Sequence, residues 1–165
     1  MEKLKGKVWK FGGDIDTDQI YPGKYLPLTD KQEMAEHAME GVLGAENFIK
    51  NVKPGDILVV GKNFGCGSSR EHAVVAIQGK GISLIIAESF ARIFYRNAIN
   101  LGLPVLECAE VDSFETGSIL LVTPETGEII DEETNKKFQA QPISGLELEI
   151  IKAGGLIKYL RGKNS

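Results

Sequence analysis

Asn63-Phe64-Gly65-Cys66-Gly67-Ser68-Ser69-Arg70-Glu71-His72 is the stretch that decides the fold, and it follows the apolar run Ile57-Leu58-Val59-Val60. An apolar run, a glycine turn and a helical pattern in this order predict a strand, a tight connection and a helix. The glycines permit positive φ and let the backbone come close to a ligand. Ser68 and Glu71 have the spacing of a capping box, which predicts that Ser68 caps the helix.

The same stretch predicts an anion site. Free N–H groups at the start of a helix favour negative charge, and Arg70 in the first helical turn adds a guanidinium that suits a carboxylate. An ordinary capped turn without a ligand is the alternative. Glu71 is interpreted as a capping residue, and His72 as a structural residue rather than a proton carrier. Cys66 lies near the helix start, where the pKa of a thiol tends to fall, so a thiol nucleophile is a further alternative.

The 165 residues of the chain predict one domain, residues 1–165. Its centre alternates between apolar runs at about 56–61, 82–87 and from 104, and helical patterns from 68 to about 78 and at about 89–101. Strands and helices that alternate at these lengths predict parallel, right-handed βαβ units. The fold class is therefore α/β.

Several shorter elements complete the expected order. A first strand is expected at 8–11, and the Asp-rich block 14–20 with the following Tyr21-Pro22-Gly23 is interpreted as loop. Asp30 is expected to begin a helix at about 31–41, and the runs 119–122 and 128–130 flank a hairpin turn. The last helix, at about 145–161, is expected to begin at a capping box of Ser144 and Glu147 and to be weakened in its middle by Gly154-Gly155.

Composition narrows the class of protein. The net charge of −4 does not favour a nucleic-acid binder, and the sequence has neither a membrane-length apolar run nor a signal-peptide core, so we expect a cytoplasmic protein. Cys66 and Cys108 fit a reducing compartment and are not expected to pair. An iron–sulfur cluster needs about three or four thiolates. We therefore expect this chain to bind no metal by itself.

Three sequence blocks carry a family resemblance. Gly-Ser-Ser-Arg-Glu-His after Asn-Phe-Gly-Cys resembles the signature of the aconitase swivelling domain, and the blocks 14–20 and 89–100 resemble its Asp-Thr-Asp and long-helix motifs. With Gly154-Gly155-Leu156 the match spans nearly the whole chain in the expected order. The wider pattern is similar to the separate small subunits of 3-isopropylmalate dehydratase and homoaconitase. The resemblance implies a three-layer β/β/α swivelling domain with a parallel βαβ core and added hairpins.

The resemblance also implies an activity. It is the reversible dehydration and hydration that interconverts 2- and 3-isopropylmalate in leucine biosynthesis, by a hydro-lyase that is active only with a large subunit. That partner would carry a 4Fe–4S cluster, and a homo-oligomer of the isolated chain is left open. Homoaconitase, or a dehydratase for another alkylmalate such as 2,3-dimethylmalate, is the alternative within the class. A non-catalytic module that binds a small anion is the alternative from a different class.

Roles for single residues follow from the resemblance. Ser68, as its alkoxide, would take and return the proton on the substrate's carbon. Ser69 and Arg70 would bind a substrate carboxylate, and Asp18 would be the aspartate of the active site, with turn formation as its alternative. Arg92 and Arg96 share one helix face and would meet either the partner or solvent.

A loop is expected to select the substrate. It comprises Tyr25, Leu26, Pro27, Leu28 and Thr29, and in the resembling family it faces the substrate's variable group. Homoaconitase-type members carry an arginine directly after Tyr-Leu, which suits an additional carboxylate. Pro27 holds that place here, and Lys24 is expected to point to solvent. The substrate is expected to be a small di- or tricarboxylate, and the loop predicts an alkyl malate rather than a tricarboxylate such as homoaconitate.

Overall fold

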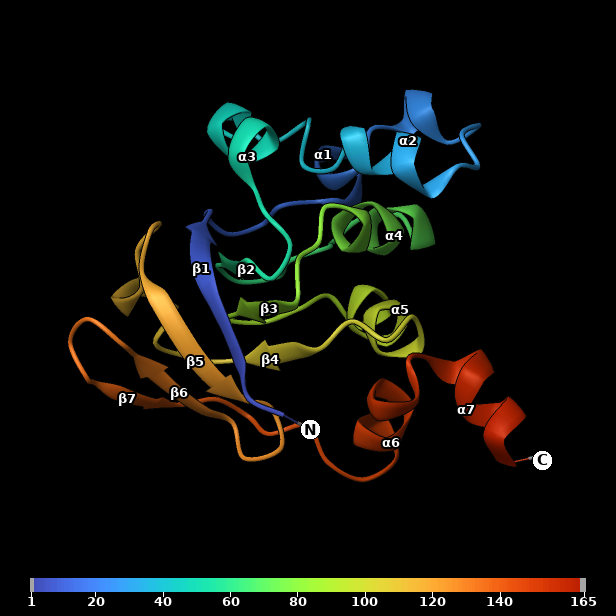
Figure 1. Ribbon diagram of the computed structural model, residues 1–165. Helices are drawn as coiled ribbons and strands as arrows, with labels where there is room; N and C mark the ends of the chain where they lie inside the picture. Colours follow the sequence, from blue (N-terminus) through green and yellow to red (C-terminus); the bar gives the residue numbers. More distant parts are fainter. Residues whose placement is uncertain (1, 164–165) are drawn as a thin grey trace.

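A single sheet of seven strands runs through the computed structural model, which describes residues 2–163, in the order β4-β3-β2-β1-β5-β6-β7 (Figure 1). Four neighbouring strands are parallel: β1 (Leu4–Lys10), β2 (Ile57–Val60), β3 (Leu84–Ala87) and β4 (Val105–Glu107). The other three are antiparallel: β5 (Ile119–Thr123), β6 (Glu128–Asp131) and β7 (Lys137–Gln139). β1 joins the two halves because it pairs with both β2 and β5.

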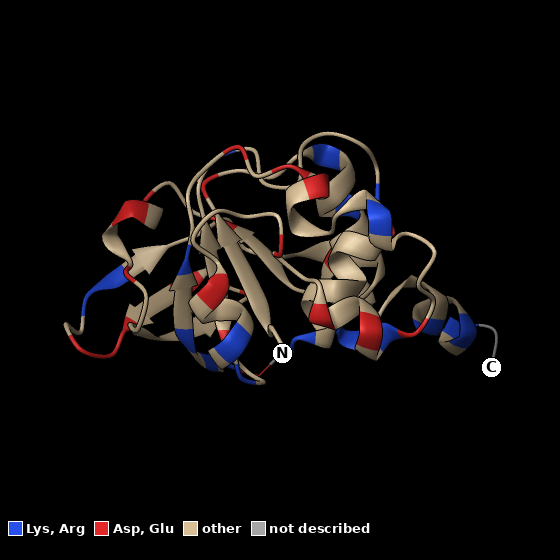
Figure 2. Ribbon diagram, turned by 90° about the horizontal axis from the view of Figure 1, so that it is seen from above, with Lys and Arg blue, Asp and Glu red and all other residues tan. Residues whose placement is uncertain are grey.

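The parallel strands separate two hydrophobic cores. Successive side chains of a strand point to opposite faces, so Leu58 and Val60 of β2 pack under the helices, whereas Ile57 and Val59 pack against the antiparallel strands. Figure 2 shows, from above, most of the helices on one side of these strands and β5–β7 on the other. The arrangement is the expected three-layer β/β/α fold, with the parallel layer buried on both faces.

Two helices cross between the parallel strands: α4 (Glu71–Gly79) follows β2, and α5 (Arg92–Asn100) follows β3. Around them lie α1 (Thr17–Ile20), α2 (Lys31–Glu36), α3 (Glu46–Asn51), α6 (Gly145–Ala153) and α7 (Leu156–Lys163), and the 3₁₀ turns Gly23–Tyr25 and Val111–Ser113. The expected βαβ units and the hairpin are confirmed. Among residues 2–163, no helix combines the length and the apolar character that a membrane crossing needs.

The predicted start of α4 is wrong. Arg70, not Ser68, is the N-cap residue, and no side chain forms a capping hydrogen bond there. Gly67 has φ of 93° and Arg70 has φ of −137° and ψ of 106°, so the backbone remains non-helical through Arg70. The Ser68–Glu71 spacing therefore does not act as a capping box, and Ser69 and Arg70 are not in the first helical turn.

The Asp-rich block is also more ordered than expected. Thr17–Ile20 forms the short helix α1, with a full capping box in which Asp16 Oδ1 accepts from the Gln19 amide and Gln19 Oε1 accepts from the Asp16 amide. α3 was not expected at all, and α2 ends at Glu36, earlier than predicted. Asp30 does begin α2, since its carboxylate accepts from the Gln32 amide.

The predicted weak point of the last helix is a complete break. α6 ends at Ala153, its C-cap residue Gly154 has φ of 92°, and α7 begins at Leu156. A Cβ on Gly155 would lie 2.8 Å from the Asn100 carbonyl oxygen, and one on Gly102 would lie 2.7 Å from the Gly154 carbonyl carbon. The glycines therefore let the end of α5 approach the break. Ser144 forms no side-chain cap, so the predicted capping box there is wrong.

A tighter constraint acts at Gly65. It has φ of 84°, and a Cβ there would lie 2.3 Å from Cγ of Phe94 on α5. We predict that Gly65→Ala lowers the free energy of unfolding by roughly 2–5 kcal/mol, from left-handed strain and overpacking together. Urea denaturation measures this change.

Gly12→Ala is the matched control for that measurement. Gly12 has no positive φ, and a Cβ there would meet nothing within 4 Å. We expect its free energy of unfolding to stay within about 0.5 kcal/mol of wild type. Equal stability of the two variants would show that the Gly65–Phe94 contact is not a constraint.

Candidate functional site

Three segments that are far apart in the sequence meet at the glycine turn 64–70. The Gly65 amide donates to the Ile15 carbonyl at 2.8 Å, and the Thr17 amide donates to the Cys66 carbonyl at 2.9 Å. The Thr17 hydroxyl, which is buried, donates to the Ser68 carbonyl at 2.8 Å. On the other side, the Ala91 amide donates to the Phe64 carbonyl at 2.9 Å. The blocks singled out in the sequence are therefore joined by their backbones.

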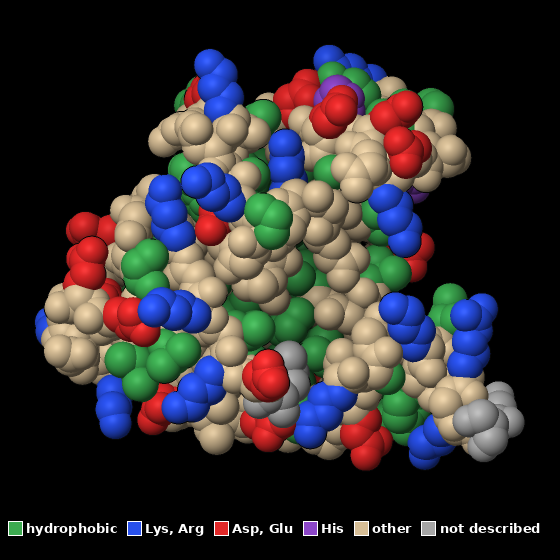
Figure 3. Space-filling model, viewed as in Figure 1, with side chains coloured by type: hydrophobic (Ala, Val, Ile, Leu, Met, Phe, Trp, Pro, Cys, Tyr) green, Lys and Arg blue, Asp and Glu red, His purple; other side chains and the backbone are tan. Residues whose placement is uncertain are grey.

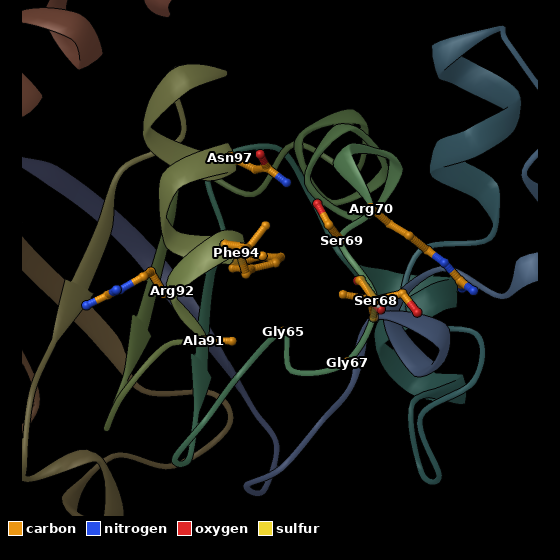
Figure 4. A pocket seen from close by; sticks show the side chains of 11 residues that line it. Gly65, Gly67, Ser68, Ser69, Arg70, Ala91, Arg92, Phe94 and Asn97 are labelled. Atoms are coloured by element: carbon orange, nitrogen blue, oxygen red, sulfur yellow. Dashed lines mark hydrogen bonds between the residues drawn. The ribbon is translucent and has the colours of Figure 1, made fainter.

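A cavity of about 280 Å³ lies between this turn and α5. It is lined by Thr17, Gly65, Gly67, Ser68, Ser69, Arg70, Ala91, Arg92, Ile93, Phe94 and Asn97. Figure 4 shows the Ser69 and Asn97 side chains directed toward the same space from opposite walls, with the Phe94 ring below Asn97. The exposed serines Ser68 and Ser69 thus stand at a cavity that has one polar and one aromatic wall.

The turn leaves several backbone donors free. Within residues 2–163, the amides of Gly67, Ser68, Ser69 and Arg70 donate no hydrogen bond, and the Ser68 hydroxyl has no partner. Successive unpaired N–H groups in a turn form a concave site for an anion. The anion-binding potential that the sequence assigned to the helix start lies in this turn instead.

Arg70 and Asp18 form an ion pair. Arg70 Nη1 donates to Asp18 Oδ1 at 2.9 Å and to the Tyr21 carbonyl at 3.1 Å, and the Gly23 amide donates to the same Asp18 oxygen at 2.9 Å. The hydrogen bond from Arg70, followed by that from Gly23, lowers the pKa of the Asp18 carboxyl. Asp18 therefore holds one nitrogen of the Arg70 guanidinium in place.

The guanidinium of Arg70 retains donors despite this ion pair. Its side chain is 17% exposed and is directed away from Asn97 and Phe94 (Figure 4). Within the described part of the chain, Nε and Nη2 donate to no protein group. A planar guanidinium held by one nitrogen can still present its other nitrogens to a carboxylate.

The substrate loop divides between two hollows. Leu26, 38% exposed, lines a groove with Ser68, Ser69, Arg70, His72 and Asn97. Leu28 packs against the core and lines a different hollow with Met34 and Val75. Pro27 and Thr29 are exposed, and neither lines the groove beside Ser68. Of the loop residues named from the sequence, Leu26 is the one brought to the two serines.

Tyr25 and Lys24, at the start of that loop, face away from the groove. The Tyr25 ring stacks on His37, with 3.5 Å between centroids, and Lys24 Nζ lies 5.2 Å from the centre of the Tyr25 ring. Lys24 is exposed, as expected. His72 stacks on the buried Tyr21 ring with centroids 5.7 Å apart, which supports its structural interpretation.

The two cysteines do not form a site. Both are free thiols, Cys66 partly buried and Cys108 buried. Burial, with a smaller contribution from Asp16, raises the pKa of the Cys66 thiol, so the expected fall in pKa is wrong and the nucleophile hypothesis loses its basis. Within residues 2–163, no group of three His, Cys, Asp or Glu side chains is placed to hold a metal ion.

Thr17, Phe94 and Asn97 line the cavity but were not named as candidates from the sequence. Asn97 and Phe94 are three apart on α5, so they share a face, and a polar residue on that face is the signal that was missed. Arg92 and Arg96 both line a separate hollow with Leu146 and Glu147, and Arg92 alone of the two also lines the cavity. The two arginines are exposed.

Comparison with known proteins identifies the family. The Aconitase C-terminal domain model matches residues 10–111. The chain is 55% identical to the 3-isopropylmalate dehydratase small subunit of Caldanaerobacter subterraneus subsp. tengcongensis, covering 97% of this chain and 99% of that protein. It is 52% identical to the methanogen homoaconitase small subunit of Methanocaldococcus jannaschii, covering 96% and 91%.

A solved structure agrees with these sequence matches. The crystal structure of 3-isopropylmalate dehydratase from Methanocaldococcus jannaschii has a TM-score of 0.93 and 49% identity, and the match covers 98% of this chain and 95% of that one. The chain belongs to the aconitase family, in the branch of separate small subunits.

The Asp18–Arg70 pair predicts a titration. Because the folded-state pKa of Asp18 is lowered, the pair contributes stability above the usual carboxyl pKa and loses it as the pH falls through the lowered value. Carbon NMR of the Asp18 carboxyl should show a pKa below the usual aspartate range, and Arg70→Gln should raise it toward that range. An Asp18 pKa that is unchanged in Arg70→Gln contradicts the pairing.

Proposed function

We propose that this chain is the small subunit of 3-isopropylmalate dehydratase, a hydro-lyase that interconverts 2- and 3-isopropylmalate together with a large subunit in the cytoplasm. The observation that carries the proposal is the gathering of Ser68, Ser69 and Arg70 at one groove, held there by the Asp18 block. The family membership and the high identity over nearly the full length of the relatives support it.

Ser68 acts as the general base. Dehydration removes a proton from one carbon and a hydroxide from its neighbour, and hydration returns both. A serine alkoxide is unstable in water and needs donors close to its oxygen. The unpaired amides of the turn and the cation at Arg70 supply them, so a lone oxyanion on Ser68 is stabilised by preorganised dipoles. Ser68 is exposed and unbonded, and is thus free to exchange a proton with a substrate.

Ser69, Arg70 and Asn97 bind and orient the substrate. A malate skeleton carries two carboxylates, and each needs donors when water is excluded. The free guanidinium nitrogens of Arg70 serve one carboxylate, while the Ser69 hydroxyl and the Asn97 amide offer donors across the cavity. Asp18 acts through Arg70, so it is a positioning residue rather than a substrate ligand.

The large subunit supplies what this chain lacks. Two cysteines with raised thiol pKa values do not suit a cluster that needs about three or four thiolates. A 4Fe–4S cluster bound by the partner would act as a Lewis acid on the leaving hydroxyl. The groove beside Ser68 is open, which suits a substrate site completed by a second chain.

The proposed variable group of the substrate is inferred from the loop, because sequence identity does not distinguish the two kinds of relative. The dehydratase subunit is 55% and the homoaconitase subunit 52% identical to this chain. Leu26 offers the groove an apolar surface, and residues 25–29 contain no cation. An alkyl group there gains about 0.8 kcal/mol per buried methylene, whereas an unpaired carboxylate is costly to bury. Lys24, the nearest cation in the sequence, lies over the Tyr25 ring.

Ser68→Ala tests the catalytic role. In the complex with the large subunit we predict a loss of turnover of ~10²–10⁴-fold, the usual effect of removing a general base, with nearly unchanged substrate KM. Ser68 makes no capping bond, so the free energy of unfolding should change by less than about 0.5 kcal/mol. Ser113→Ala, at an exposed serine outside the cavity, is the control. Turnover within a factor of about two of wild type for Ser68→Ala would show that Ser68 is not the base, and no turnover by the wild-type complex would favour a non-catalytic anion-binding module.

Leu26→Arg tests the substrate. We predict that it shifts the ratio of kcat/KM for homoaconitate over 3-isopropylmalate upward by about 10–100-fold, the worth of a hydrogen bond to a charged group. The variant is placed at Leu26 because Leu26 lines the groove beside Ser68, whereas Leu28 lines a different hollow, so Leu28→Arg is the matched control. Equal shifts of this ratio in both variants would show that contact of Leu26 with the groove does not determine substrate choice. A wild-type preference for homoaconitate would favour the alternative, a homoaconitase small subunit.

A further inference from the structure

A cluster of titratable side chains lies behind the substrate loop, outside the cavity. Glu40 Oε1 accepts from the Tyr25 hydroxyl at 2.7 Å, and Glu40 Oε2 contacts His37 Nδ1 at 2.5 Å. The His37 ring also stacks on the Tyr25 ring at an interplanar angle of 10°. Figure 3 shows histidine and acidic side chains at the surface of the lobe that contains α1 and α2. None of these three side chains lines the groove beside Ser68.

The protonation states suit this contact. Partial burial acts to raise the pKa of Glu40, but the hydrogen bonds from His37 and Tyr25, with smaller electrostatic contributions from His37 and Lys24, lower it, and the net shift is downward. The hydrogen bond to Glu40 raises the pKa of Tyr25. At neutral pH a carboxylate therefore accepts from a protonated phenol, which is a charge-assisted hydrogen bond.

Tyr25 is connected to Arg70 through Tyr21. The Tyr21 hydroxyl donates to the Tyr25 carbonyl at 2.5 Å, and the Tyr21 carbonyl accepts from Arg70 Nη1. The Tyr21 ring is fully buried, so it is a fixed support. The contacts from Glu40 to Tyr25, from Tyr25 to Tyr21 and from Tyr21 to Arg70 join the loop to the carboxylate-binding side chain without passing through the substrate groove.

The rest of the loop has little else to hold it. Leu26, Pro27 and Thr29 are exposed, and Leu28 is the one residue from 26 to 29 that packs against the core. The Glu40 side chain remains 35% exposed and the His37 side chain 25% exposed, so the cluster contributes little buried apolar area. The cluster instead fixes the position of the Tyr25 backbone. It thereby restrains Leu26, which is the next residue in the chain.

We infer that Glu40 is a positioning residue that, through Tyr25, fixes the distance between Leu26 and Arg70 and so sets which length of substrate side chain the groove accepts. The inference rests on the proposed function, because it assumes that Arg70 binds a carboxylate and that Leu26 meets the variable group. A group that fixes geometry affects discrimination between substrates more than it affects turnover of a small one.

The experiment compares Glu40→Ala and Tyr25→Phe with wild type in the complex with the large subunit. The measured quantity is the ratio of kcat/KM for 2-isopropylmalate over 2-methylmalate, which differ only in the size of the alkyl group. We expect each variant to lower this ratio about tenfold, the change that the loss of one charge-assisted hydrogen bond corresponds to, while kcat for 2-methylmalate stays within about a factor of two. A merely structural loss of folded protein would lower both efficiencies equally and leave the ratio unchanged.

Two further variants sharpen the comparison. Glu40→Gln keeps an acceptor for the Tyr25 hydroxyl and should restore most of the ratio. Glu36→Ala removes an exposed acid from α2, four residues before Glu40, and should leave the ratio as in wild type. If Glu36→Ala lowers the ratio as much as Glu40→Ala does, the effect is one of charge and the inference is wrong.

Amide hydrogen exchange of the isolated chain gives a readout that needs no substrate. The Leu26 amide donates to the Gly23 carbonyl at 3.1 Å and the Leu28 amide to the Tyr25 carbonyl at 3.0 Å. Both should exchange at least about tenfold faster in Glu40→Ala and Tyr25→Phe but not in Glu36→Ala. Unchanged exchange overturns the inference, as does faster exchange with an unchanged substrate ratio. If the wild-type complex converts neither malate, the proposed function fails, and the role of Glu40 in substrate choice is overturned with it. The hydrogen-exchange measurement still decides whether Glu40 fixes the loop.

Discussion

The hydrogen bonds of buried Thr17 determine what the rest of the site can do. Its amide donates to the Cys66 carbonyl and its hydroxyl to the Ser68 carbonyl, and on the opposite side Gly65 packs closely against Phe94. Thr17 thus holds the turn by the Cys66 and Ser68 carbonyls. The turn is ordered through its acceptors, so the amides from Gly67 to Arg70 are not used to hold it and can serve an anion.

The charged side chain of Arg70 is also held in place by hydrogen bonds. Arg70 is held from one edge by Asp18 and the Tyr21 carbonyl, and Asp18 is itself held by the Gly23 amide. A guanidinium restrained in this manner loses less conformational entropy when it binds a carboxylate. The exposed position of Asp18 keeps the pair weak as a source of stability. Its main effect is on direction, because it keeps Arg70 at a set orientation beside the serines.

The sequence was sufficient for elements whose pattern is long. β2, β3, α4 and α5 follow from apolar runs and helical spacing, and the break of the last helix follows from Gly154-Gly155. It was not sufficient for α1, whose four residues are too few to show a period. The Ser68–Glu71 spacing was misleading because a capping box also requires helical backbone directly after the cap, and Gly67 and Arg70 do not adopt it. Asn97 and the inward or outward direction of Leu26 and Leu28 depend on tertiary packing, which local spacing does not contain.

In the proposed function the substrate site is shared between two chains, which places a particular demand on each of them. Neither chain can rely on the substrate to order its half, since the substrate reaches its full set of contacts only when both halves are present. The half on this chain meets that demand with local contacts: Thr17 orders the turn, Asp18 orders Arg70, and Tyr21 with Tyr25 orders the loop. Each of these contacts lies behind the groove, so the groove itself keeps unpaired donors and an apolar surface. Preorganisation of this kind lowers the entropic cost of assembling the reacting groups, which is where much of the rate of a two-part active site originates.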